Sequence, residues 1–203
     1  SKGNQKAISI TAFGIQGEIE LRRNACKSGD VILTTGIHGL SKLGFLIKNK
    51  IYFDNDISLN KRLISKSIEH FCRPKVYPNF LKNLIKTRSN KKIKRIGCTD
   101  SSDGLFQALQ DLASASKCKA IINYEKIPKD KDWPRGNKWD EYYFFGGEDY
   151  ELVFSLPKKW AKNLTKLDKE INEIGFFTDG EPSIEFKDNK KNKLLEITPF
   201  KHF

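Results

Sequence analysis

The sequence predicts an α+β fold in which a mixed β-sheet is flanked by α-helices. Short β-branched and aromatic runs alternate with amphipathic stretches, and the C-terminal part ends in closely spaced short strands that are typical of hairpins. A chain of 203 residues with 38% hydrophobic side chains is able to bury a core. Its 14 glycines and 7 prolines exclude a collagen-like or broadly disordered protein, and its length corresponds to one or two domains.

The N-terminal half is expected to begin with two strands and to continue with helices. Alternation of apolar with small or polar residues indicates a half-buried strand that ends at Gly14, and a β-branched run indicates a second strand. Ser58 is placed to cap a helix that Pro74 stops, and Pro78 suits the first turn of the next helix. The expected elements are strands at 7–13 and 31–35 and helices at 40–47, 58–73 and 76–85.

The C-terminal half mixes strands with helices. A stripe of leucine and alanine predicts a helix directly after a strand. The apolar spacing from Trp160 to Ile174, ended by Gly175, predicts the clearest amphipathic helix of the chain. The expected elements are strands at 93–99, 120–124, 151–156, 176–177, 184–186 and 194–197, helices at 105–115 and 160–174, and a loop at 128–140.

The chain is strongly basic, with a formal net charge of +12, which suits an anionic partner such as a phosphate ester, a nucleic acid or an acidic membrane surface. No apolar run approaches the roughly 18 residues that a bilayer-spanning helix needs. The four cysteines lack the spacing of a zinc site. We therefore expect a cytoplasmic protein with reduced thiols and no membrane partner.

Basic residues without any acidic one are concentrated between residues 82 and 95. A solvated loop between a helix and a strand explains this run. A surface for single-stranded nucleic acid would carry aromatic rings among the basic side chains, and the run has none. We therefore expect no nucleic-acid partner and keep a basic nucleic-acid-binding domain only as an alternative function.

The densest chemical signal is Thr-Asp-Ser-Ser-Asp-Gly-Leu at residues 99–105, where an apolar strand gives way to a helix. Unpaired N–H groups at a helix N-terminus attract anions such as phosphate. Asp100 and Asp103 suit Mg2+, which binds a few carboxylates together with phosphate oxygens, and Ser102 adds a hydroxyl donor. A plain helix cap is an equally good interpretation of the two aspartates.

The second signal is Phe-Phe-Gly-Gly-Glu-Asp-Tyr-Glu-Leu at residues 144–152, directly before a strand. Its glycines permit a close backbone approach, and the carboxylates of Glu148, Asp149 and Glu151 favour a cationic or hydrogen-bond-donating partner. A glycine turn with solvated acids is the alternative. A third signal, Arg-Arg-Asn-Ala-Cys-Lys-Ser-Gly-Asp at residues 22–30, is explained almost as well by a surface hairpin.

Taken together and in this order, the segments resemble the thiamine-monophosphate kinase family, within the ATP-binding superfamily that includes aminoimidazole ribonucleotide synthetase and selenophosphate synthetase. Gly-Gly-Glu-Asp-Tyr-Glu-Leu is the part specific to this kinase family. The implied fold is the C-terminal domain of the aminoimidazole ribonucleotide synthetase-like fold. The matching segments span nearly the whole chain: residues 23–30, Thr-Thr-Gly-Ile-His-Gly, residues 99–105, residues 146–152 and the terminal Phe-Lys-His-Phe.

The resemblance implies ATP-dependent phosphorylation of thiamine monophosphate to thiamine diphosphate, by positioning and electrostatics and without a covalent nucleophile. Two departures from the family are visible. Ser101 stands where an apolar residue is more common, which weakens the expected packing, and Phe200 lacks the polar group of tyrosine or tryptophan. Carried onto this sequence, the resemblance assigns Mg2+ to Asp100 and Asp103, ATP to Arg23 and Ser102, and the thiamine phosphate substrate to Glu148 and Phe200.

The resemblance also implies a larger protein. Residues 1–20 are expected to end an N-terminal ATP-binding domain, and residues 21–203 to form a C-terminal α/β domain. A homodimer is expected to form through the N-terminal domain. The 203-residue chain alone is expected to be inactive, because part of the metal site would be absent. Another enzyme of the same superfamily with a different acceptor is the first alternative.

Overall fold

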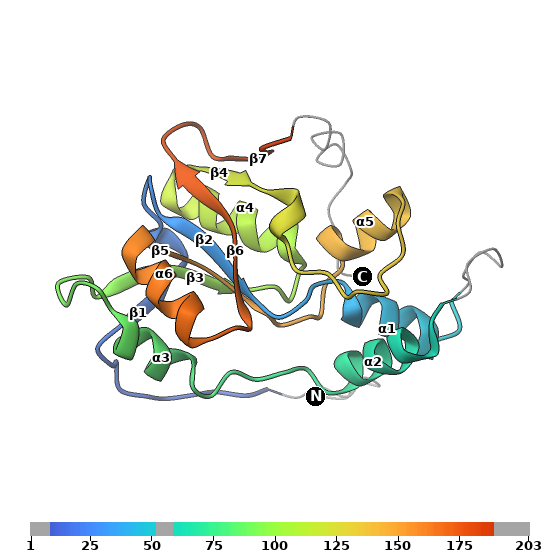
Figure 1. Ribbon diagram of the computed structural model, residues 1–203. Coiled ribbons are helices and arrows are strands. Elements are labelled where there is room, and N and C mark those ends of the chain that lie inside the picture. The colour runs from blue at the N-terminus through green and yellow to red at the C-terminus, as the bar shows by residue number, and fades with distance from the viewer. Residues whose placement is uncertain (1–8, 52–58, 189–203) are drawn as a thin grey trace, which may run out of the picture.

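The computed structural model of the chain describes residues 9–51 and 59–188. Its centre is a mixed seven-stranded sheet in the order β1-β3-β5-β2-β6-β4-β7 (Figure 1). The pairs β1–β3 and β4–β7 are parallel, and the other neighbours are antiparallel. The strands are β1 (Glu20–Arg22), β2 (Val31–Thr35), β3 (Arg95–Asp100), β4 (Lys119–Ile122), β5 (Leu152–Leu156), β6 (Ile171–Thr178) and β7 (Ser183–Phe186).

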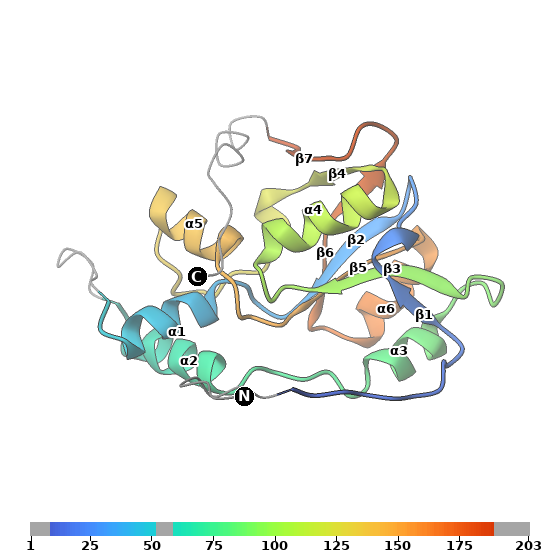
Figure 2. The ribbon, with the colours of Figure 1, turned by 180° about the vertical axis from the view of Figure 1, so that it is seen from behind.

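Helices cover both faces of this sheet, which confirms the expected α+β class. Figure 1 shows α6 in front of the sheet, and Figure 2, turned by 180°, shows α4 in front of the opposite face. Two short 3-10 turns, η1 (Arg23–Ala25) and η2 (Tyr124–Lys126), complete the fold. The helices are α1 (Leu40–Lys48), α2 (Lys61–Cys72), α3 (Phe80–Thr87), α4 (Leu105–Ser116), α5 (Asn137–Phe145) and α6 (Lys158–Leu167).

The core is divided between the two faces because neighbouring residues of a strand point to opposite sides. Ile32 of β2 belongs to the cluster that includes the leucines of α4. Its neighbours Val31 and Leu33 belong to the cluster that contains Trp160 and Leu164 of α6. Every residue of β2 is buried as a result.

Helices α1 and α2 lie side by side at one end of the sheet in both views (Figures 1 and 2). Gly44 permits their close approach, because a Cβ atom there would lie 2.1 Å from the carbonyl oxygen of Ser67. Helix α2 begins later than expected. The side chain of Asn60 caps it by accepting the N–H of Arg62 at 2.8 Å, and Ser58, the expected cap, lies outside the described residues.

The expected strand at 7–13 is wrong for residues 9–13, which have no regular structure. The side chains of Ile10 and Phe13 are 88% and 95% exposed. Alternation of apolar and polar residues produces a half-buried strand only where a neighbouring strand pairs with it, and the described residues provide none here. The expected division between residues 20 and 21 stays a prediction, although β1 pairs with β3 across that boundary.

The expected helix at 160–174 ends early, because residues 171–178 form strand β6. Spacings of three and four continue to Ile174, but β6 pairs with both β2 and β4, and this pairing overrides the local pattern. The expected loop at 128–140 is also wrong in its last part, where α5 begins at Asn137 and buries several aromatic rings.

Smaller differences concern helix ends. Helix α3 starts at Phe80, four residues after the expected start, and leaves Val76 exposed. In α4 the expected stripe is buried at Leu105, Ala108, Leu109 and Leu112, but its last member, Ala115, is exposed, and Ala113 is buried instead. The strand expected at 194–197 lies outside the described residues.

Within the described part of the chain, no helix combines the length and the apolar character needed to cross a lipid bilayer.

Candidate functional site

The segment at residues 99–105 leads from the end of β3 into α4. Asp100 is the last residue of β3, and the N–H of Gly104 donates to the carbonyl of Ser101 at 3.0 Å to close the turn. Gly104 itself occupies the N-cap position of α4, so neither aspartate stands at that position. It has a positive φ of 96°, and a Cβ atom there would lie 3.0 Å from the carbonyl oxygen of Phe145. Asp100 and Asp103 are both partly exposed.

The segment at residues 146–152 packs directly against this turn. The N–H of Glu148 donates to the carbonyl of Ser102 at 2.7 Å, and the N–H of Ser101 donates to the carbonyl of Glu151 at 2.9 Å. A Cβ atom on Gly147 would lie 2.5 Å from the carbonyl oxygen of Ser102, so only glycine fits there. The two acidic segments that the sequence predicts therefore form one surface, although about 50 residues separate them.

Ser101 replaces the apolar residue that is more common in the resembled family, yet it strengthens this connection. Its side chain is fully buried, and its hydroxyl accepts the N–H of Glu151 at 3.1 Å. A buried hydroxyl needs such a partner. The expected weakening of packing is therefore offset by a hydrogen bond between the two segments.

The acidic segment alternates between outward and inward side chains. Glu148 and Tyr150 face outward, with Tyr150 41% exposed, whereas Asp149 and Glu151 are buried. Glu148 and Tyr150 have positive φ angles of 69° and 54°. Such left-handed backbone costs a non-glycine residue about 1–2 kcal/mol, so the surrounding contacts must hold it in place.

Asp149 provides one of these contacts as the buried cap of α1. Its carboxylate accepts the N–H of Gly39 at 2.6 Å and that of Ser41 at 2.9 Å. A carboxylate at a helix N-terminus satisfies unpaired N–H groups and interacts favourably with the helix dipole. Burial nevertheless dominates and raises the pKa of Asp149 to about 7.

Glu151 provides the second contact and lies among three donors. Its carboxylate accepts the hydroxyl of Thr35 at 2.5 Å and that of Tyr77 at 2.6 Å, and Nε2 of His70 lies 3.5 Å away. Burial alone would raise the pKa of Glu151, but its hydrogen bonds, from His70 foremost, hold it below its ordinary value. The hydrogen-bond donors around Asp149 and Glu151 are thus groups of the protein itself, whereas Glu148 is partly exposed.

Arg23 lies at the same edge of the sheet as the two acidic segments. It follows β1, and its Nε donates to the hydroxyl of Thr99 at 3.2 Å, next to Asp100. One of its terminal nitrogens lies 3.4 Å from Asp111 on α4. The hydrogen bonds between the two acidic segments bring Asp100, Ser102, Asp103 and Glu148 to one edge, and Arg23 lies beside Thr99 and contacts α4. Phe200, the remaining predicted site residue, lies outside the described residues.

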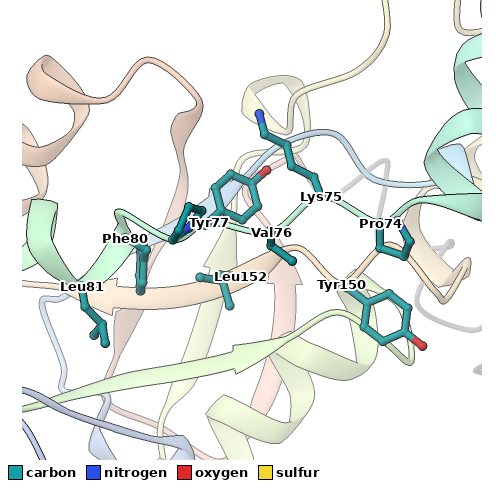
Figure 3. Close-up of a pocket in the computed structure, with 9 residues that line it drawn as sticks. Pro74, Lys75, Val76, Tyr77, Phe80, Leu81, Tyr150 and Leu152 are labelled. Atoms are coloured by element: carbon teal, nitrogen blue, oxygen red, sulfur yellow. The ribbon is translucent and has the colours of Figure 1, made fainter.

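A pocket of about 600 Å3 begins beside Tyr150 and extends between the chain after α2, the first turn of α3 and the start of β5 (Figure 3). Tyr150 connects this pocket to the acidic edge, because its hydroxyl donates to Glu148 at 2.9 Å. That bond, burial and the charges of Glu148, Asp100 and Asp103 raise the pKa of Tyr150. The lining residues are Pro74, Lys75, Val76, Tyr77, Pro78, Phe80, Leu81, Tyr150 and Leu152.

The donor set at the turn fits Mg2+ rather than a metal held entirely by protein. Among the described residues, no group of three or more metal-ligating His, Cys, Asp or Glu side chains exists. Mg2+ commonly binds one or two carboxylates and takes its other oxygens from water and substrate phosphates. Asp100 and Asp103, both partly exposed beside the start of α4, offer two carboxylates of this kind.

Sequence reasoning missed the residues that hold the acidic segment. His70 had a usable signal, because it lies on the face of α2 that also buries Leu63 and Ser67. A polar side chain on such a face usually has a buried partner. Thr35 belongs to the Thr-Thr-Gly-Ile-His-Gly segment and Tyr77 gave no signal, but only the folded chain brings the two residues to Glu151.

Comparison with known proteins agrees with the architecture. Residues 27–187 match the model of the family described as AIR synthase related protein, C-terminal domain. The thiamine-monophosphate kinase of Prochlorococcus marinus is 34% identical over 203 residues, which cover 100% of this chain and 61% of the relative. The thiamine-monophosphate kinase of Nitrosopumilus maritimus is 31% identical over 207 residues, 99% of this chain and 62% of the relative. The chain thus spans about three fifths of the length of these curated relatives.

Solved structures show the same fold. Thiamine-monophosphate kinase from Stenotrophomonas maltophilia K279a superposes with a TM-score of 0.66 at 21% identity, over 82% of this chain and 52% of that one. AaThiL complexed with AMPPCP and TMP superposes with a TM-score of 0.61 at 25% identity, over 83% of this chain and 50% of that one. The expected C-terminal domain of the aminoimidazole ribonucleotide synthetase-like fold is confirmed.

Proposed function

We propose that the protein is a thiamine-monophosphate kinase. The chain belongs to the family of AIR synthase related proteins, whose C-terminal domain matches residues 27–187. The protein transfers the γ-phosphoryl group of ATP to thiamine monophosphate and forms thiamine diphosphate. One observation carries the proposal: the two acidic segments fold into one surface beside Arg23. The similarity of the chain to curated kinases over its whole length supports it.

The arrangement is suited to catalysis by positioning. Asp100 and Asp103 would hold Mg2+, which when bound neutralises phosphate charge and orients the reacting oxygens. Arg23, which contacts Thr99, and Ser102, which stands between the two aspartates in the turn, are suited to ATP, because a guanidinium and a hydroxyl both donate to phosphate oxygens. Glu148, at the same edge, offers a negative charge to the cationic thiazolium ring of the acceptor. Phosphoryl transfer to a phosphate oxygen needs no covalent enzyme nucleophile.

The net charge of the chain supports the same proposal. A formal charge of +12 favours the approach of two phosphate-bearing substrates.

AMPPCP and TMP occupy the related AaThiL structure, which is in keeping with a nucleotide and a second ligand here.

Further parts of the proposal concern the whole protein. We propose that it works in the cytoplasm as a homodimer, with Mg2+ as cofactor and without a nucleic-acid or membrane partner. Residues 1–20 would belong to an N-terminal ATP-binding domain and residues 21–203 to the C-terminal domain. Phe200 would stack on the substrate. The 203-residue chain by itself would be inactive, because an N-terminal domain supplies further metal ligands.

The test is a coupled assay for ADP release by the full-length protein with Mg-ATP and thiamine monophosphate. We expect ADP release that depends on the acceptor. The amount of ADP released is expected to equal the amount of thiamine diphosphate formed. A reaction without acceptor gives the background. Release at background with thiamine monophosphate, but above it with the acceptor of another superfamily member, would contradict the proposal.

A further inference from the structure

Among the described residues, His70 is the one side chain that faces both buried carboxylates of the acidic segment. Its Nε2 lies 3.5 Å from Oε1 of Glu151, and its Nδ1 lies 3.7 Å from Oδ1 of Asp149 and 3.0 Å from the hydroxyl of Ser41. Within this part of the chain, each other hydrogen bond to these carboxylates reaches only one of them. His70 therefore connects the two inward side chains to each other and to helix α2.

The backbone that carries the His70 ring is fixed on both sides. Ser67, one turn earlier on α2, lies at the close approach to Gly44 of α1. Directly after His70, the ring of Phe71 packs edge-on against that of Phe45 on α1, with 5.7 Å between the ring centres. Helix α2 is thus packed on α1 just before and just after the residue that reaches the two carboxylates.

The His70 ring also covers the buried carboxylates. The ring and Glu151 line a cavity of about 430 Å3. The side chain of His70 is 13% exposed, whereas those of Asp149 and Glu151 are at most 1% exposed. Loss of the ring would leave each carboxylate with one contact fewer and would give water a place beside them, and water would compete with the fixed donors.

The consequence lies at the two outward side chains of the segment. Because outward and inward residues alternate, the anchored carboxylates of Asp149 and Glu151 hold the backbone that carries Glu148 and Tyr150. Glu148 and Tyr150 have positive φ angles, a conformation that persists only where surrounding contacts hold it. A displaced carboxylate would let this backbone relax and would move the Glu148 side chain.

We infer that His70 is a positioning residue, which holds Asp149 and Glu151 together and thereby fixes Glu148 at the acidic edge. The inference rests on the proposed function and adds to it a residue that acts through the protein and not by contact with a substrate. Glu148 is proposed to meet the acceptor and not ATP. His70 is therefore expected to affect the KM for thiamine monophosphate selectively.

The test compares His70→Leu with His70→Gln in the full-length protein. Leucine and glutamine have similar volumes, but only glutamine keeps an N–H donor for Glu151. His70→Leu is expected to raise the KM for thiamine monophosphate at least about tenfold, while the KM for ATP changes less than about twofold. His70→Gln is expected to raise it only about threefold, because its amide serves one of the two carboxylates.

Leu63→Ala is the matched control, because Leu63 is fully buried on the same face of α2, two turns before His70. It weakens the packing of the helix and is expected to lower the unfolding midpoint without changing the KM for thiamine monophosphate. A smaller folded fraction lowers the apparent kcat but not the KM, so the KM separates positioning from stability. An equal rise of this KM in Leu63→Ala and His70→Leu would overturn the inference.

A second readout does not depend on turnover. The N–H groups of Glu148 and Glu151 donate to Ser102 and Ser101, so hydrogen exchange of residues 146–152 reports whether the segment stays in place. His70→Leu is expected to speed this exchange at least about fivefold, and Leu63→Ala less than about twofold.

The outcomes distinguish the inference from the proposed function. An unchanged KM for thiamine monophosphate in both His70 variants would overturn the inference and leave the proposed function intact. If His70→Leu does not fold, an unchanged KM in His70→Gln overturns the inference by itself. Absence of acceptor-dependent turnover in the unmodified protein would refute the proposed function, and the exchange rates would still decide whether His70 holds the segment.

Discussion

Replacing Gly36 by alanine tests the buried hydrogen bonds that hold the acidic segment. Gly36 has a positive φ of 52°, and a Cβ atom there would lie 2.0 Å from Oε1 of Glu151 and 2.2 Å from its carboxyl carbon. The carboxylate must move to admit the methyl group. Gly29 is a matched control, because it also has a positive φ, of 86°, but no heavy atom lies within 4 Å of its added Cβ.

The magnitude follows from what each substitution disturbs. Left-handed backbone costs alanine about 1–2 kcal/mol at either position. At Gly36, moving the carboxylate also breaks the bonds from Thr35 and Tyr77, each about 1.5–3 kcal/mol for a charged acceptor. Gly36→Ala is therefore expected to lose about 4–8 kcal/mol of unfolding free energy, and Gly29→Ala about 1–2 kcal/mol. The larger loss is comparable to the whole stability of a typical domain, about 5–15 kcal/mol.

Urea unfolding followed by circular dichroism measures both variants. Gly29→Ala is expected to shift the midpoint slightly, and Gly36→Ala is expected to shift it to a much lower urea concentration. Equal losses of unfolding free energy in the two variants would show that backbone strain alone, and not the displacement of Glu151, sets the cost.

Two further predictions concern ionisation. Burial raises the pKa of Asp149 to about 7. Between about pH 4 and 7 the folded protein therefore binds more protons than the unfolded one. The contribution of Asp149 to the free energy of unfolding falls as the pH rises through that window, by up to about 1.4 kcal/mol per pH unit. Asparagine does not titrate, so the stability of Asp149→Asn relative to the unmodified chain should increase as the pH rises through this window, as measured by urea unfolding. Parallel pH profiles of the two proteins would contradict the raised pKa of Asp149. Of the four free cysteines, Cys72 alone is exposed, and burial raises the pKa of Cys98 and Cys118 to about 12. One thiol should react rapidly with an aromatic disulfide at about pH 8, and Cys72→Ser should abolish this phase; a second rapid phase would contradict the burial of the others.

The sequence predicts this fold best where the pattern is local. The strand and helix around Asp100 and Asp103 are contiguous, so the apolar run, the turn residues and the helical stripe identify them directly. The segment after Leu167 shows the opposite case. Ile171 and Ile174 fit the helical period, yet they lie in β6, because pairing with β2 and β4 is decided by residues far away in the chain.

The roles within the acidic segment show the same limit. The sequence indicates that several carboxylates precede β5, but not that Asp149 and Glu151 turn inward. Their partners Gly39 and Thr35 are 110 and 116 residues distant, and no local spacing encodes such contacts. Glu148 is partly exposed, and Tyr150 becomes informative only once its ring is seen to form the wall of a pocket.

The proposed divalent-cation site is tested most directly by the turnover of Asp103→Asn in the full-length protein, measured against Mg2+ concentration. Amide for carboxylate would remove a proposed metal ligand from a partly exposed turn outside the core. Asp179→Asn changes an exposed carboxylate elsewhere and serves as the control.

Asp103→Asn is expected to remain folded, to lose turnover on the order of a hundredfold or more and to need higher Mg2+, by analogy with the removal of one transition-state contact. Unchanged turnover with an unchanged Mg2+ dependence would contradict the claim that Asp100 and Asp103 hold the divalent cation.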